Sequence, residues 1–391
     1  MFAARTDWDL TPTRLAAALA ARRAAGRPIL DLTESNPTRC GLTFDADALL
    51  GALAHPEGLR YDPAPLGLPR ARAAVADYYA AKGVALAPDR ICLTASTSEA
   101  YGFLFRLLAD PGDEVLVPSP SYPLFDFLAG LNDVRLVPYP LVYEGRWRIA
   151  LDAVRGAAGP RARALVVVHP NNPTGSFLRP DERDALVGLC RDRGLALIPD
   201  EVFADYAFEP AGDRVATLAG TAGAPTFVLS GVSKVVALPQ LKLAWIAASG
   251  PQDLARAALA RLEVIADTYL SVGTPVQRAL PALLAGRAEI QGRVLARLRA
   301  NRKALGDWLA ARGPVEALQA EGGWYAVLRL RGVRDEEAWA VDLLEKDGVV
   351  VHPGYLFDFA EAGHMVVSLL PAKDVFAEGI GRLLARAAPP G

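Results

Sequence analysis

Short apolar runs alternate with helical patterns through the middle of this chain, and this alternation restricts its fold more than any other feature. Several runs consist almost entirely of Val, Leu and Ile, which is typical of strands buried on both faces. Strands that alternate with helices predict a parallel sheet with helices on its faces. We therefore expect an α/β protein whose main sheet is mostly parallel and has seven strands. The seven runs are residues 91–96, 114–119, 134–139, 164–170, 195–201, 226–231 and 243–249.

A long helical stretch over about residues 251–312 follows the last run, and Pro275 is expected to break or kink it. Short strand-like runs with helices between them make up the rest, which predicts a smaller α+β domain joined by an N-terminal helix. A chain of 391 residues has room for two such domains. The expected division is a large domain over 40–280 and a small domain made of 1–39 plus 281–391.

Composition excludes several classes of function. The net charge of -2 and the lack of a run of Lys and Arg argue against nucleic acid or an anionic membrane as partners. Three separated cysteines and four histidines without ligand spacing predict neither a disulfide framework nor a metal site. The Ala- and Arg-rich N-terminus contains acidic residues and lacks an apolar core, so we expect no signal peptide and a cytoplasmic protein.

Polar segments follow four of the apolar runs, at the sheet edge where ligands bind in such folds. Each also has a plain structural explanation. The segment ASTSEA begins a helix, whose free N–H groups suit a phosphate, although an ordinary N-cap looks the same. NNPTG places Asn172 beside a ligand, or forms only a turn. The segments are residues 95–100, 171–175, 199–206 and 230–242.

Two charged side chains at this edge indicate the chemistry. Lys234 follows the buried run TFVL, where a lysine is costly to desolvate and a lowered pKa makes it a nucleophile towards a carbonyl. Asp200 ends the run LALI and can pair with a buried cationic nitrogen, as a pyridoxal-phosphate enzyme requires, although a helix N-cap explains it as well.

Together, NNPTG, the Asp-Glu pair at 200–201 and the Ser-Lys pair at 233–234 resemble the signature of the class I and II aminotransferases, over about residues 28–385. The resemblance implies the aspartate-aminotransferase-like fold type I of pyridoxal-phosphate (PLP) enzymes. It also implies a homodimer with shared active sites, because Tyr61 matches the tyrosine that reaches the partner subunit's phosphate.

The family's residue roles are expected at matching positions here. Lys234 is the expected Schiff-base lysine and proton-transfer base, Asp200 the partner of the ring nitrogen, and Asn172 the donor to the ring's phenolic oxygen. Tyr122 is expected to stack on the cofactor ring. The expected phosphate contacts are Ser96, Thr97, Ser98, Ser233, Lys242 and the partner's Tyr61.

The sequence departs from the family at three positions. Phe203 stands where the family has a tyrosine that donates to the phenolic oxygen, so we expect a less acidic internal imine. Lys242 replaces an arginine that binds the phosphate through two parallel bonds. Val366 replaces the arginine that holds the substrate α-carboxylate.

Several other groups are candidates for that carboxylate. Ser35 and Asn36 offer a backbone site, and the remaining candidates are Lys373, His352, Arg329 and Arg331. Four aromatic residues in segments that border the substrate mouth in this family suggest an aromatic or apolar substrate, although they also suit a hydrophobic core. They are Trp324, Tyr355, Phe357 and Phe359.

The function expected from the resemblance is transfer of an amino group between an amino acid or related amine and a 2-oxo acid. A second hypothesis is another reaction of fold type I, such as a C–S β-lyase, a decarboxylase or a cyclising enzyme of specialised metabolism. The missing arginine strengthens this second hypothesis, since function depends on the site and not on the fold. A third, the PLP-fold effector domain of a transcription regulator, would need an N-terminal DNA-binding domain for which residues 1–27 leave no room.

Overall fold

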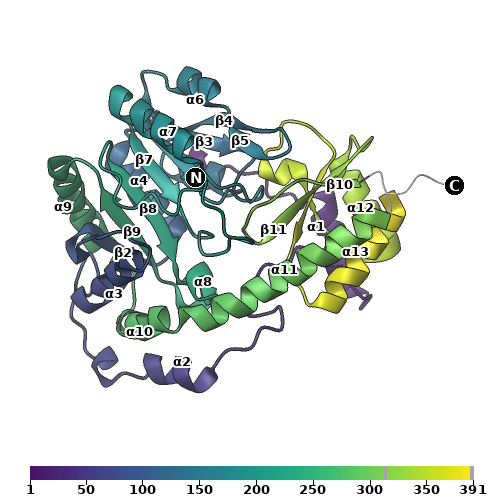
Figure 1. Ribbon diagram of the computed structural model, residues 1–391, viewed down its shortest axis with the longest axis horizontal. Coiled ribbons are helices and arrows are strands. Elements are labelled where there is room, and N and C mark those ends of the chain that lie inside the picture. Colours follow the sequence, from purple (N-terminus) through teal and green to yellow (C-terminus); the bar gives the residue numbers. More distant parts are fainter. Residues whose placement is uncertain (312–314, 388–391) are drawn as a thin grey trace.

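A computed structural model describes residues 1–311 and 315–387, which form two lobes joined by a long helix (Figure 1). The larger lobe is built on an eight-stranded sheet of order β2-β9-β8-β7-β6-β3-β4-β5. The central pairs are parallel, whereas β9 runs antiparallel to both of its neighbours and β5 antiparallel to β4. The strands are β2 Ile91–Thr94, β3 Glu114–Ser119, β4 Arg135–Tyr143, β5 Trp147–Ile149, β6 Ala162–Val168, β7 Ala196–Asp200, β8 Thr226–Gly231 and β9 Ala244–Ser249.

All seven predicted runs lie in this sheet, and the expectation of a mostly parallel sheet is confirmed. The eighth strand, β5, was not predicted, because its three residues are too few to show a period. Residues of β7, β8 and β9 are buried throughout, which explains why these runs are continuously apolar.

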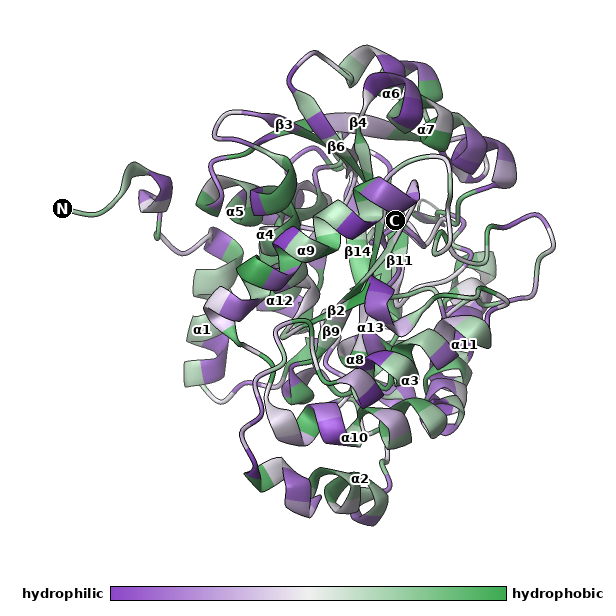
Figure 2. Ribbon diagram, turned by 90° about the vertical axis from the view of Figure 1, so that its left-hand side faces the viewer, coloured by the Kyte–Doolittle hydropathy of each residue, from purple (hydrophilic) through white to green (hydrophobic). Residues whose placement is uncertain are grey.

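Helices cover both faces of the sheet and produce two separate apolar layers. One layer contains buried residues of α4, α5 and α9, and the other contains those of α3, α6, α7 and α10. In Figure 2 the central strands are largely green, and the helices around them carry purple segments on their outer sides. These helices are α3 Pro69–Ala80, α4 Thr97–Leu108, α5 Phe125–Leu131, α6 Leu151–Ala157, α7 Pro180–Arg193, α8 Val232–Val235, α9 Gln252–Tyr269 and α10 Thr274–Ala285.

The break expected at Pro275 is confirmed. Helix α9 ends at Tyr269, α10 begins at Thr274, and Pro275 occupies its first turn, where no backbone N–H is needed. The expected domain boundary at residue 280 lies inside α10, which packs on α3 of the larger lobe. Helix α11, Arg287–Ala311, then crosses to the smaller lobe (Figure 1).

The smaller lobe holds an antiparallel sheet of order β10-β11-β14-β13 and a separate parallel pair, β1 with β12. Helices α1, α12 and α13 enclose its core together with α11. Its elements are α1 Arg14–Ala24, β1 Leu30–Asp31, β10 Val315–Ala317, β11 Tyr325–Leu330, α12 Glu336–Asp347, β12 Val349–Val350, β13 His352–Pro353, β14 His364–Ser368 and α13 Lys373–Ala387.

The remaining short elements lie at the edges of the two lobes. Helix α2, Ala46–Leu53, packs on α10 without burying any residue of its own. The exposed N-terminal segment lies beside α5, where Arg5 forms an ion pair of 2.7 Å with Asp133 and the Trp8 ring packs against Phe127 (Figure 2). The 3₁₀ turns are Ala4–Thr6, Pro56–Leu59, Pro88–Arg90, Pro239–Leu241 and Gly354–Phe357.

Three negative findings apply to the described residues, 1–311 and 315–387. None of their helices is long and apolar enough to cross a membrane. No group of three or more His, Cys, Asp or Glu side chains among them could hold a metal ion. All three cysteines, Cys40, Cys92 and Cys190, are buried and free.

Candidate functional site

The carboxyl ends of three neighbouring strands gather the polar residues predicted to carry chemistry. Asn171 and Asn172 follow β6, Asp200 ends β7, and Lys234 lies just beyond β8 in the short helix α8. Because β6, β7 and β8 are adjacent in the sheet, their ends lie side by side. The structure therefore brings together residues that are far apart in the sequence.

Lys234 occupies an aromatic environment. Its Nζ lies 4.6 Å from the ring centroid of Trp324 and 5.5 Å from that of Phe203. Burial of the amine lowers the pKa of Lys234 to about 8, and the nearby Asp200 carboxylate opposes this shift. The backbone oxygen of Lys234 accepts a hydrogen bond of 2.5 Å from the Tyr206 hydroxyl, which holds the main chain of α8.

Asp200 is a buried carboxylate, only 6% exposed. Its Oδ2 accepts from the Tyr101 hydroxyl at 3.1 Å and its Oδ1 from the Val202 N–H at 3.2 Å. Burial raises the pKa of Asp200 to about 6, against the lowering effect of these bonds and of Lys234. No salt bridge to Asp200 occurs among the described residues, so a cation held beside it would satisfy the group.

The loop after β6 contains two buried amides with unpaired atoms. Asn171 Oδ1 accepts from the Thr174 hydroxyl at 3.0 Å, which fixes the loop. Within the described part of the chain, Asn171 Nδ2 and Asn172 Oδ1 are buried and have no hydrogen-bond partner. Buried polar atoms are normally paired, so these amides are available to a bound group.

Three residues predicted to bind a phosphate, Ser96, Thr97 and Ser98, lie at the start of α4. Ser96 is the N-cap, and its Oγ accepts from the Glu99 N–H at 3.0 Å, so its hydroxyl already has the structural role considered from the sequence. Thr97 and Ser98 are the first helical residues, whose N–H groups have no partner within a helix. Ser98 is hydrogen-bonded to the Tyr122 hydroxyl, whose pKa burial raises. Tyr122 therefore lies beside the start of α4.

The other predicted cofactor residues are placed as follows. Ser233 precedes Lys234 in α8, and Lys242 lies in the left-handed conformation (φ 49°) just before β9. Tyr61 is 73% exposed and borders a separate cavity of about 40 Å³ that also includes Ser271 and Thr274.

Among the residues predicted to contact the substrate, Val366 is apolar and three polar residues already have partners. Val366 is fully buried on β14, where its backbone neighbours are Val327 on β11 and His352 on β13. Ser35 is hydrogen-bonded to the Tyr325 hydroxyl, and Asn36 uses its Oδ1 to accept from Thr38. Arg329, one of the alternative carboxylate ligands, forms an ion pair of 2.6 Å with Glu316.

Sequence reasoning missed several residues that shape this site. Tyr101 donates to the Asp200 carboxylate, and Tyr206 donates to the backbone oxygen of Lys234. Of these two tyrosines, only Tyr206 lies within one of the polar segments identified from the sequence. Asp205, which had no role from the sequence, forms an ion pair of 2.7 Å with Lys82 and accepts from Tyr78 and Gln291. These contacts join segments distant in sequence, and no local pattern announces them.

The comparisons with known proteins agree with this geometry. The family model "Aminotransferase class I and II" matches residues 29–375. The chain is 26% identical to the glutamate-pyruvate aminotransferase AlaA of Haemophilus influenzae, over 92% of this chain and 90% of that protein. It is 29% identical to the alanine aminotransferase of Mycobacterium tuberculosis, over 92% and 86% respectively.

Solved structures share the fold over almost the entire chain. An alanine aminotransferase from Pyrococcus furiosus superimposes with a TM-score of 0.90 at 23% identity, covering 99% of both chains. A single mutant of Thermus thermophilus aspartate aminotransferase gives 0.86 at 25% identity, again covering 99% of both. The fold is therefore that of aspartate aminotransferase, as the sequence predicted.

Proposed function

This chain belongs to the aminotransferase class I and II family and is an aminotransferase, and we propose that Lys234 is the lysine that carries its cofactor, pyridoxal phosphate. The family generally uses this cofactor. The observation that carries the proposal is the partly buried amine of Lys234, with its lowered pKa, beside a buried Asp200 that lacks a cationic partner among the described residues.

Each side chain at the sheet edge suits one task. When bound, pyridoxal phosphate supplies an electron sink. Asp200 would keep a proton on the ring nitrogen, and Asn172 would bind the ring's phenolic oxygen. Lys234, as a neutral amine, takes and returns a proton at the reacting carbon of the substrate. Tyr122 packs against the ring.

We assign the phosphate to the start of α4 and to the turn around α8. The backbone N–H groups of Thr97 and Ser98 point from a helix N-terminus, which favours an anion. Ser233 adds a hydroxyl and Lys242 a positive charge. Because the Ser96 hydroxyl caps the helix, we assign its contribution to the backbone.

The amino donor we propose is an amino acid with a small, aromatic or apolar side chain, and the acceptor is a 2-oxo acid. The relatives include proteins named for alanine, glutamate and pyruvate. The aromatic rings of Phe203 and Trp324 near Lys234, with Tyr325 packed against Phe203, suit an apolar side chain. With Val366 in place of an arginine, this position supplies no charged contact to the α-carboxylate, which all amino-acid donors share.

We also propose that the protein is a homodimer with shared active sites. Three large apolar side chains on one segment are unusually exposed: Leu50 at 65%, Leu59 at 94% and Tyr61 at 73%. Such a patch is typical of a covered surface. In the dimer, the partner's Tyr61 would reach the phosphate, while each chain supplies its own Lys234.

A panel of amino acids mixed with the cofactor-loaded enzyme tests this function. Transamination converts the cofactor absorbance to that of its pyridoxamine form and yields the matching 2-oxo acid without ammonia. We expect this with alanine and with aromatic donors. Release of pyruvate and ammonia from cysteine conjugates, without the absorbance change, would instead support a β-lyase.

A further inference from the structure

Trp324 is the ring closest to the Lys234 amine, yet no polar contact of its own holds it there. It is completely buried, and its Nε1 has no hydrogen-bond partner in the part of the chain that the structure describes. Its ring packs edge-on against Phe203 and Tyr206 at 5.4 and 5.2 Å between centroids. The position of the indole therefore depends on packing and on the backbone that carries it.

The backbone just before Trp324 is fastened to the larger lobe. The N–H groups of Glu321 and Gly322 both donate to Gly175 O at 3.1 Å, and Gly323 N–H donates to Tyr206 O at 3.0 Å. A fourth bond runs from Phe208 N–H to Glu321 O at 2.9 Å. Gly175 closes the NNPTG loop, so this segment joins the loop that carries Asn172 to the turn that carries Tyr206.

The contact between these backbones leaves no room for side chains. A Cβ atom added to Gly175 would lie 2.4 Å from Gly322 O, and one added to Gly322 would lie 2.5 Å from Tyr206 O. Real Cβ atoms do not approach so closely, so either substitution must push the two backbones apart.

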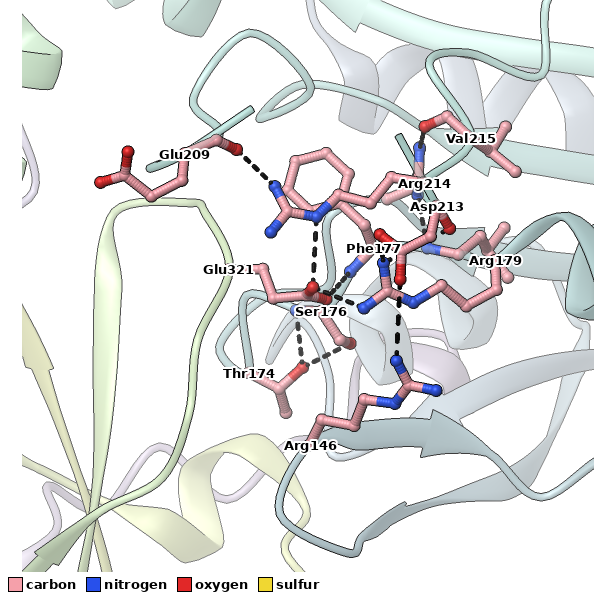
Figure 3. Close-up of polar contacts among 12 residues, drawn as sticks. Arg146, Thr174, Ser176, Phe177, Arg179, Glu209, Asp213, Arg214, Val215 and Glu321 are labelled. Carbon is pink, nitrogen blue, oxygen red and sulfur yellow. Dashed lines mark hydrogen bonds and ion pairs between the residues drawn. The ribbon is translucent and has the colours of Figure 1, made fainter. Parts of the chain in front are cut away.

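The Glu321 side chain completes the attachment (Figure 3). Its Oε1 lies 2.6 Å from Arg179 Nη2 and 3.1 Å from Arg214 Nε, and its Oε2 accepts from the Phe177 N–H at 3.3 Å. The side chains of Glu321 and Arg179 are each 9% exposed, so water cannot replace these bonds without a structural change. Arg179 is held in turn by Asp213 at 2.9 Å.

We propose that Glu321 is a positioning residue for the reaction: by fastening residues 321–323 to the larger lobe, it keeps Trp324 against the amine of Lys234 and excludes water from it. The proposal rests on the proposed role of Lys234. Tyr206 belongs to the same unit, because it accepts from Gly323 and donates to the backbone of Lys234. Release of the segment would let water reach the amine, and hydration favours its charged form.

The experiment measures Lys234 in the apoprotein, without reference to turnover. Trace acetylation with acetic anhydride at a series of pH values, followed by mass spectrometry of the Lys234 peptide, gives the pH at which the amine loses its proton. In wild-type protein we expect a midpoint near 8, where burial places the pKa. A second readout is the pH dependence of the visible absorbance of the cofactor-loaded enzyme.

Three variants release the segment in different ways, and a fourth variant serves as the control. Glu321→Ala removes the carboxylate, Glu321→Gln removes its charge and turns one acceptor oxygen into an amide donor, and Gly322→Ala pushes the backbones apart while leaving the side chains of the ion pairs in place. The control, Glu316→Gln, breaks the half-exposed pair with Arg329 on the neighbouring strand of the same sheet. Thermal melting of each variant shows which are folded.

We expect the acetylation midpoint to rise by about one pH unit or more in Glu321→Ala and Gly322→Ala, towards that of an ordinary lysine, and less in Glu321→Gln. The control should keep the wild-type midpoint even if its melting temperature falls. If Glu321→Ala does not fold, Gly322→Ala and Glu321→Gln decide. Unchanged midpoints in the folded variants would overturn the inference, whereas cofactor attachment at a lysine other than Lys234 in wild-type protein would overturn the proposed function.

Discussion

The two surfaces that meet at the site, the carboxyl edge of β6, β7 and β8 and the facing strands β11 and β14, differ in chemistry. The first carries a lysine, a carboxylate and two amides. Each amide has one buried polar atom without a hydrogen-bond partner among the described residues. At the position where the resemblance led us to expect a cation, the second carries Val366, fully buried beside Val327.

This difference separates two tasks of the enzyme. The edge of the large sheet holds the groups that we assign to the cofactor, and it retains most of the family's residue types. We propose that the small sheet contributes to substrate recognition, and the arginine that the resemblance led us to expect there is replaced by Val366. If this assignment holds, relatives that share the reaction can differ in substrate, because the groups we assign to the two tasks lie on different lobes.

The largest effect should come from the first surface. Lys234→Ala should abolish turnover, because among the described residues only the Lys234 amine is seen to lie over the rings of Trp324 and Phe203, and it should remove the visible absorbance of the lysine-bound cofactor. Weak cofactor binding through the phosphate contacts should remain. Retention of the absorbance, or labelling of Lys242 in wild-type protein, would refute the assignment.

Asp200→Ala should reduce kcat/KM by roughly 100-fold, since a charged hydrogen bond to the ring nitrogen is worth about 1.5–3 kcal/mol. Asp205→Ala is the matched variant from the same loop. It should keep most of its activity per folded molecule but lower the melting temperature, because Lys82 then loses its partner. Equal losses of activity in the two variants would remove the distinction between catalytic and structural carboxylates.

A mixture of two inactive variants tests whether the first surface is completed by a second chain. Lys234→Ala and Tyr61→Ala subunits, unfolded and refolded together, should recover roughly a quarter of wild-type activity, because half of the dimers then contain one intact site of two. Each variant refolded alone is the control. Activity no higher than that of the separate parents would argue against shared sites.

The smallest effect should come from the second surface. Val366→Arg should change KM for alanine and for aspartate by several-fold while leaving the cofactor spectrum intact. The new side chain must fit a fully buried position, so a loss of about 1–3 kcal/mol in stability is expected. Val366→Met is the control for added volume. Unchanged kinetics with every donor in a folded protein would show that this position is not the carboxylate site.

The sequence by itself determined where seven strands lie along the chain and which polar residues lie at the edge of the large sheet. Continuous apolar runs identified seven strands because burial on both faces leaves no room for polar residues. Asn172, Asp200 and Lys234 were recognisable because each lies at or just beyond the carboxyl end of a strand, and parallel neighbours must place such residues together. The loss of an arginine at Val366 was likewise visible in the sequence.

Only the tertiary structure decided which groups surround the lysine and hold it in place. Trp324 reaches Lys234 from the smaller lobe, and Tyr101 reaches Asp200 from helix α4. Glu321 pairs with Arg179, which lies 142 positions away in the sequence. Each contact depends on the approach of two segments whose separation along the chain carries no periodic signal. Local patterns therefore report on burial and strand ends, whereas the environment that lowers the pKa of Lys234 exists only once the two lobes are packed together.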